Sequence, residues 1–136
     1  LQIAELELAE PFMVMAATDG CFGYLPGPGH FEVTLLEELR NAVSLDDWAQ
    51  RLTKAFNAVA GDDTSFAAMA FDHSFEAMRR GTAGWLAQLH DEQVAPVAKA
   101  ADAEQRRAAV DHAWQLYRRR FTARRNEMHV GTVEGE

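Results

Sequence analysis

Two short acidic turns contain the residues of this sequence with the clearest potential for chemistry. Asp19 follows an apolar run at residues 12–17, and Asp62 precedes another at residues 66–71. If these runs are neighbouring antiparallel strands, the end of one lies beside the start of the other, and both carboxylates reach one rim of a sheet. Two such carboxylates repel unless a proton or a cation lies between them. Because Mg²⁺ and Mn²⁺ prefer carboxylate oxygen, the pattern predicts a magnesium or manganese site with Asp19 and Asp62 as ligands.

The same residues also fit an interpretation without a metal. Asp-Gly is among the commonest turn dipeptides, and the segment Asp-Asp-Thr-Ser at 62–65 is typical of a polar turn. Spacing alone does not decide between a metal site and two plain turns. The five histidines are scattered without the spacing of metal ligands. Cys21 has no histidine in a suitable setting, so we expect a small buried residue there and assign no catalytic side chain.

Apolar spacing predicts the elements that would position the two aspartates. The unbroken runs at 12–17 and 66–71 predict strands buried on both faces. Glycines and prolines between residues 20 and 30 predict a loop. Two helices should follow, at about 31–43 and from Ser44, as the N-cap, to about 60. Their apolar stripes are Phe31, Leu35, Leu39 and Ala42 in the first helix, and Leu45, Trp48, Leu52, Phe56 and Val59 in the second.

The second half of the chain has only helical patterns. We expect a helix from about residue 74 that is weak at Gly81 and Gly84 and is bent or ended by Pro96. A longer helix should start at Asp102, which has capping-box spacing to Gln105. Each helix has one apolar face, so the two should pair as an antiparallel hairpin. The predicted seams are Phe75, Met78, Leu86 and Leu89 against Val110, Trp114, Tyr117 and Phe121.

Composition excludes several classes of function. Residues 1–101 hold 6 Lys/Arg against 15 Asp/Glu, and this acidic excess argues against nucleic acid as a partner. No apolar stretch approaches the roughly 20 residues of a membrane-spanning helix, so we expect no membrane partner. A single cysteine and the absence of a charged-then-apolar leader favour a cytoplasmic protein. The basic stretch from Arg118 to Arg125 fits an acidic partner or polyphosphate as a ligand, but we favour a solvated helix face that docks on the acidic first half.

A resemblance to a known family adds a specific hypothesis. The segment 12–20, Phe-Met-Val-Met-Ala-Ala-Thr-Asp-Gly, resembles the part of 2C-class metal-dependent serine/threonine phosphatases where an apolar strand ends in Ser/Thr-Asp-Gly. The segment 61–66, Gly-Asp-Asp-Thr-Ser-Phe, is similar to their Asp-Asn-x-Ser/Thr segment, which opens another strand. Both aspartates bind the metal cluster in that family, which implies this role for Asp19 and Asp62. The implied activity is hydrolysis of phosphoserine or phosphothreonine in a phosphoprotein substrate by a metal-activated water.

The resemblance also implies the organisation of the chain. The expected fold class is α+β, with residues 1–72 as the C-terminal part of the phosphatase domain, that is, part of a β-sandwich flanked by helices. Residues 73–129 would form a C-terminal helical hairpin, weakly similar to extensions on some bacterial members, and residues 130–136 a frayed tail. The segments with the family's other metal-bridging aspartate and its phosphate-binding arginine have no counterpart in this sequence. We therefore expect the chain to be a fragment that needs the missing N-terminal half as a partner and is inactive alone.

Departures from the family pattern leave other functions open. The family has an apolar residue and then Trp-Asp after Asp-Gly, whereas this chain has Cys21-Phe22-Gly23, and Asp63 stands where Asn is usual. A pseudophosphatase that binds phosphoprotein or metal without turnover is one alternative. A non-catalytic interaction module that keeps only the fold is another.

Overall fold

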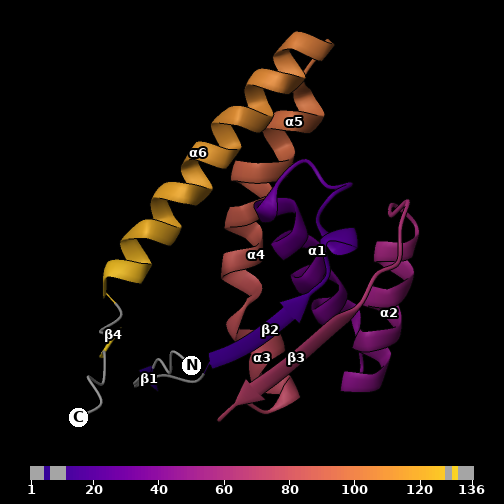
Figure 1. Ribbon diagram of the computed structural model, residues 1–136, viewed down its shortest axis with the longest axis vertical. Helices are drawn as coiled ribbons and strands as arrows, with labels where there is room; N and C mark the ends of the chain where they lie inside the picture. Colours follow the sequence, from indigo (N-terminus) through magenta and orange to yellow (C-terminus); the bar gives the residue numbers. More distant parts are fainter. Residues whose placement is uncertain (1–4, 7–11, 128–129, 132–136) are drawn as a thin grey trace, which may run out of the picture.

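The computed structural model describes residues 5–6, 12–127 and 130–131, and shows a mixed α+β chain that is mostly helical (Figure 1). A small antiparallel sheet (residues 12–17 and 66–71) lies against two helices (28–41 and 45–57). A longer helical arm, residues 75–127, packs beside them. The elements in chain order are β1 (Glu5–Leu6), β2 (Phe12–Ala17), the 3₁₀ turn η1 (Asp19–Cys21), α1 (Pro28–Asn41), α2 (Leu45–Asn57), β3 (Phe66–Phe71), α3 (Phe75–Gly81), α4 (Ala83–Leu89), the π-helical turn η2 (His90–Val94), α5 (Ala95–Lys99), α6 (Ala103–Glu127) and β4 (Val130–Gly131).

Strands β2 and β3 have the predicted bounds and pair antiparallel, from Phe12 opposite Phe71 to Ala17 opposite Phe66. The prediction that both strands are buried on both faces is wrong. One face contacts the core through side chains such as Met13 and Ala70, but Val14 is 55% exposed on the other face and its partner Met69 is 61% exposed. A β-sandwich is not present in the described part of the chain, where β2 and β3 form a sheet of two strands.

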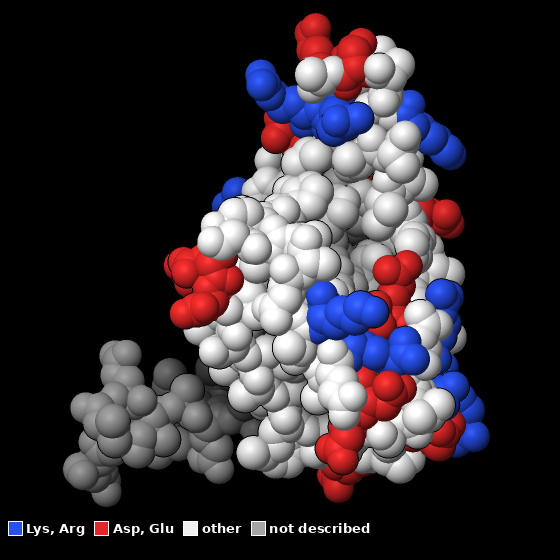
Figure 2. All heavy atoms as spheres, turned by 90° about the vertical axis from the view of Figure 1, so that its right-hand side faces the viewer, with Lys and Arg blue, Asp and Glu red and all other residues white. Residues whose placement is uncertain are grey.

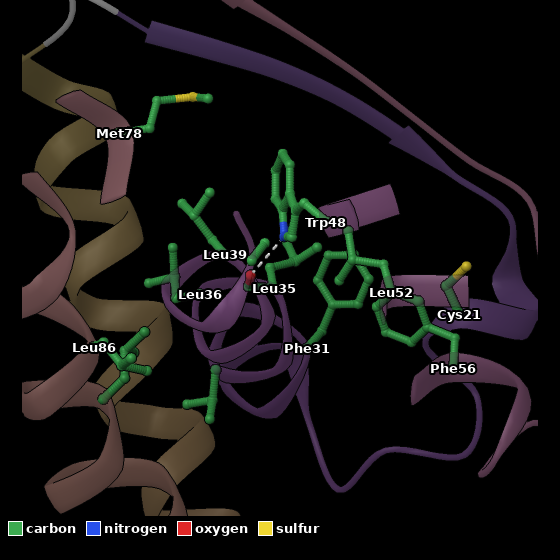
Figure 3. Packing of buried hydrophobic residues seen from close by; sticks show 13 residues of the cluster. Cys21, Phe31, Leu35, Leu36, Leu39, Trp48, Leu52, Phe56, Met78 and Leu86 are labelled. Carbon is green, nitrogen blue, oxygen red and sulfur yellow. Dashed lines mark hydrogen bonds between the residues drawn. The ribbon is translucent and has the colours of Figure 1, made fainter. Parts of the chain in front are cut away.

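Helices α1 and α2 form the best-buried part of the molecule. The predicted stripe of the first helix is buried in full, and Leu39, in the last turn of α1, is completely buried. In α2 the central residues Trp48, Leu52 and Phe56 are buried, whereas the predicted ends of the stripe, Leu45 and Val59, are exposed. The Trp48 indole donates to the Leu35 carbonyl at 3.1 Å and so joins the two helices (Figure 3).

The local signals for helix ends are largely confirmed. The Ser44 hydroxyl accepts from the Asp47 amide at 3.1 Å, and the Asp102 carboxylate accepts from the Gln105 amide at 2.8 Å. The first arm helix breaks after Gly81, as expected. The helix does not end at Pro96, but its hydrogen-bonding pattern changes in the turn before it. Because proline offers no amide hydrogen to the turn before it, the α-helical pattern gives way to the π-helical turn η2 and resumes in α5.

The helical arm forms a hairpin, with α6 returning beside α5, but the predicted seam is wrong in two respects (Figure 1). Met78, Leu86 and Leu89 join the same buried cluster as α1 and α2 instead of facing only α6. On α6, Trp114 is 40% exposed and Phe121 is 59% exposed. The small Ala113 is the buried residue at this contact, where its carbonyl accepts from the buried Gln93 side chain at 3.1 Å. The core therefore runs continuously from α1 and α2 into α3 and α4.

The two ends of the chain are described only in part. Glu5–Leu6 pairs antiparallel with Val130–Gly131, which lies inside the segment predicted to be a frayed tail. Residues 132–136 lie outside the described part. Of residues 1–11, only Glu5 and Leu6, which form β1, are described.

Candidate metal site

The two acidic turns lie at the same end of the β2–β3 sheet. Ala17 pairs with Phe66, so the last residue of β2 lies beside the first residue of β3. The pairing continues one residue further, because the Thr18 amide donates to the Ser65 carbonyl at 3.0 Å. The Thr18 hydroxyl accepts from the Ser65 amide, also at 3.0 Å. The structure thus brings together the two turns that carry Asp19 and Asp62.

Close backbone packing extends this contact toward the two aspartates. Gly20 is buried, and a Cβ atom placed on it would overlap the carbonyl oxygen of Asp63. The Cys21 thiol, which is 1% exposed as expected for a small buried residue, lies 3.5 Å from the Ser65 carbonyl oxygen. The turns are therefore in direct van der Waals contact.

The two carboxylates have matching local geometry. One oxygen of Asp19 accepts from the Gly20 amide at 3.0 Å, and one oxygen of Asp62 accepts from the Asp63 amide at 2.8 Å. Within the described part of the chain, no hydrogen bond reaches the second oxygen of either carboxylate, and both residues are exposed to solvent. Each residue therefore retains an oxygen that a hard cation could use.

A complete metal centre is not assembled by this chain's described residues, among which no three His, Cys, Asp or Glu side chains converge. Asp63 is exposed, as Asp19 and Asp62 are, and follows Asp62 directly in the same turn. Residues 19, 62 and 63 can supply carboxylate oxygens at one rim of the sheet. Any further ligands for an ion would have to come from water or from another polypeptide segment.

Sequence reasoning missed an aromatic contact beside the turns. Tyr24, from the glycine-rich loop, packs over Gly61 so closely that a Cβ there would lie 2.7 Å from the tyrosine hydroxyl. Tyr24 is itself half exposed. A lone tyrosine in a loop of glycines and prolines has no periodic partner, and the sequence therefore gave no indication of where its ring lies.

A small cavity of about 130 Å³ opens next to the same turns. Its polar wall includes Asn57, whose side-chain oxygen accepts from the Thr64 hydroxyl at 2.8 Å. The cavity lies between α2 and the start of β3 and is lined by Cys21, Ala49, Leu52, Thr53, Phe56, Asn57, Thr64 and Phe66. With one thiol and no acidic lining residue, it offers no second set of metal ligands.

The prediction that the basic stretch of α6 docks on the acidic part of the chain holds only in part. Arg120 pairs with Glu92 and lies over the Trp85 ring, with 5.4 Å from its guanidinium carbon to the ring centroid. This contact ties α6 to the acidic part of the chain, whereas Arg118 and Arg119 are exposed. On the face shown in Figure 2, Lys and Arg are interspersed with Asp and Glu beside a broad uncharged area. No helix in the described residues combines the length and apolar character needed to cross a bilayer.

Comparisons with protein-family models, with curated proteins and with solved structures gave no match to this chain. The resemblance to 2C-class phosphatases thus depends on the two segments around Asp19 and Asp62 and on the elements between them. The first segment contains strand β2, helices α1 and α2 lie between the segments, and the second segment leads into strand β3, in the order expected.

Proposed function

We propose that this chain is the C-terminal part of a 2C-class metal-dependent serine/threonine phosphatase, with Asp19 and Asp62 as two of its metal ligands. The observation that carries the proposal is the contact between the two acidic turns at one rim of the β2–β3 sheet. Antiparallel pairing of β2 and β3 accounts for the shared rim, and at that rim each turn carries an exposed carboxylate beside the contact. Electrostatic repulsion disfavours that arrangement unless a cation offsets it.

The chemistry of the complete site would depend on bound Mg²⁺ or Mn²⁺. Such ions lower the pKa of a bound water and neutralise charge that develops on phosphoryl oxygens. Asp19 and Asp62 would each offer the oxygen that the neighbouring amide does not hold. The amide hydrogen bonds at Gly20 and Asp63 fix the orientation of the two carboxylates before an ion binds. The phosphate-binding arginine and the remaining acidic ligand would belong to the N-terminal half of the domain.

The outer face of the sheet supports the same proposal. Alternate residues of β2 and β3 place an entirely apolar set on that face: Phe12, Val14, Ala16, Ala67, Met69 and Phe71. The Phe12 and Phe71 rings stack with centroids 4.7 Å apart, and Val14 and Met69 are the most exposed pair. A solvated sheet face ordinarily alternates toward polar side chains. We propose that a second sheet, supplied by the N-terminal half, covers this face to complete a β-sandwich.

A pseudophosphatase is the second candidate, and one observation favours it. The segment after Asp19-Gly20 has a packing role in this chain: Cys21 is buried, and the Phe22 ring lies 4.5 Å from the Phe31 ring. The family's second aspartate, which is associated with an additional metal, has no equivalent there. This candidate predicts metal or phosphoprotein binding at the same rim without turnover.

Hydrolysis assays with the complete domain test the proposal. The 136-residue chain alone should not hydrolyse p-nitrophenyl phosphate or a phosphothreonine peptide. The chain joined to its N-terminal half should do so only with Mn²⁺ or Mg²⁺ present. Asp19→Asn and Asp62→Asn should each abolish this activity, because loss of a ligand uncouples the ion from the water that it activates.

Asp46→Asn provides the matched control, because Asp46 is an exposed acid in the first turn of α2, away from the rim. Its activity should equal that of the unsubstituted protein. Metal-independent activity, or full activity in the Asp19→Asn variant, would contradict the proposal. Metal binding at the rim without hydrolysis by the complete domain would favour the pseudophosphatase.

A further inference from the structure

Gly20 is the point of closest approach between the two acidic turns. It is buried, and a Cβ placed there would overlap the Asp63 carbonyl oxygen and lie 3.2 Å from the Asp63 carbonyl carbon. Both atoms belong to the backbone, so no flexible side chain can move aside to make room. A residue larger than glycine at position 20 would have to push the two turns apart.

The contact joins the residues that directly follow the two proposed metal ligands in the sequence. Asp19 precedes Gly20, and Asp62 precedes Asp63, so each carboxylate belongs to the residue adjacent to one side of the contact. Each carboxylate also accepts a hydrogen bond from the contacting residue itself, that is, from the Gly20 and Asp63 amides. Any separation of Gly20 from Asp63 therefore moves the two carboxylates with it.

A second glycine in the same loop has a different environment. A Cβ on Gly23 would lie 3.5 Å from the Asp19 carbonyl oxygen, which is an ordinary van der Waals contact. Gly23 is exposed, whereas Gly20 is buried. The two positions separate the effect of a methyl group at the contact from the general effect of replacing a loop glycine.

We infer that Gly20 is a positioning residue, whose missing side chain allows the Asp19 and Asp62 turns to approach closely enough to share one ion. This inference rests on the proposed metal-binding function. The Thr18–Ser65 hydrogen bonds hold the strand side of the contact, and Gly20 sets the spacing on the carboxylate side. Outer residues that orient metal ligands typically change metal affinity by about 10–100-fold when they are substituted.

Manganese titration of the ¹⁵N-labelled 136-residue chain, followed by paramagnetic broadening of amide signals, tests this role. In the unsubstituted chain the amides of residues 18–21 and 61–65 should broaden together, with one midpoint. Gly20→Ala should raise that midpoint by at least about tenfold or give the two turns different midpoints. Gly23→Ala should behave as the unsubstituted chain does. A role limited to stability would lower the melting temperature without separating the two turns.

A second variant covers the case in which Gly20→Ala fails to fold. Thr18→Val removes the acceptor of the Ser65 amide without adding volume at Gly20, and should raise the common midpoint by a smaller factor. If folded Gly20→Ala keeps the unsubstituted midpoint in both turns, the inference is overturned and the proposed function stands. The inference is overturned equally if Gly20→Ala does not fold and Thr18→Val leaves the midpoint unchanged. If the unsubstituted chain shows no broadening, or broadening of one turn only, the proposed shared ion is overturned together with the role of Gly20.

Discussion

The α1–α2 pair and the β2–β3 sheet are built from similar apolar residues but differ in how fully they are covered. Leu39 in α1 is completely buried between other helices, whereas Met69 in β3 is among the most exposed apolar residues of the described chain. Apolar character therefore predicts that a segment tends to be buried. It does not show whether this chain supplies the element that buries it. The helices complete their own core, and the sheet presents an apolar face to solvent.

Stability measurements at those two residues test this difference in burial most directly. Leu39→Ala should lower the free energy of unfolding by about 2–5 kcal/mol, because it removes a large buried side chain and leaves a cavity. Met69→Ala should cost less than about 1 kcal/mol, because its side chain has few neighbours to lose. Urea denaturation of both variants measures the difference. Equal losses would mean that the outer face of the sheet is covered in solution.

Trp48 and Trp114 allow a second comparison of a buried with an exposed residue, with a smaller expected effect. Trp48→Phe removes ring volume from the core and the hydrogen bond to the Leu35 carbonyl, and should cost about 1–2 kcal/mol. Trp114→Phe on α6 should change stability by less than about 1 kcal/mol, since Trp114 retains much of its solvent contact. Thermal melts of the two variants provide the check. A larger loss at Trp114 would restore the seam that the sequence predicted.

Substitutions of two serines test the same comparison, with a difference in stability nearly as large as that expected for the tryptophans. Ser44→Ala removes the N-cap of α2, where the hydroxyl accepts from the Asp47 amide, and should cost about 1 kcal/mol. Ser65, at the start of the sheet, contributes its backbone amide and carbonyl to the contact with Thr18. Ser65→Ala should therefore be nearly neutral. Circular dichroism melts would detect the opposite order, which would show that the Ser65 hydroxyl has a role.

The smallest expected effect is a pH dependence at Asp47. Hydrogen bonds from Arg51 and from the Val43 amide lower the pKa of the Asp47 carboxyl below its ordinary value of 3.8. A carboxyl with a lowered pKa in the folded state stabilises the fold above its unfolded pKa, and this contribution is lost as the pH falls through the folded pKa. Asp47→Asn should thus flatten the loss of stability below about pH 4. Melting temperatures of this variant and of the unsubstituted chain between pH 2 and pH 7 measure the difference.

The sequence was most informative where a local pattern determines the structure. Both strand ranges, the Phe31–Ala42 stripe and the caps at Ser44 and Asp102 follow from spacing and from hydrogen-bonding groups within a few residues. The placement of the two acidic turns at one rim followed from antiparallel pairing, once the strands were identified. Each of these features is decided by neighbouring residues or by one pairing rule.

The features that the sequence could not predict depend on which element happens to lie opposite. Trp114 and Phe121 have helical spacing, but α6 packs on its neighbours through the small Ala113 and through Tyr117. Nothing in the apolar pattern of residues 12–17 indicates which face remains uncovered. The contact of Gly20 with the Asp63 carbonyl joins residues that are far apart in the chain, and a glycine in an Asp-Gly turn has a purely local explanation as well.

Anomalous X-ray scattering at the manganese edge, from crystals of the complete domain grown with MnCl₂, tests the shared-ion claim most directly. The proposal predicts an anomalous peak adjacent to both Asp19 and Asp62, either in direct coordination by their oxygens or linked to them through one bound water. Crystals of the Asp19→Asn variant should lose or weaken that peak. A manganese ion bound elsewhere, or Asp19 and Asp62 turned away from each other with no peak between them, would contradict the account.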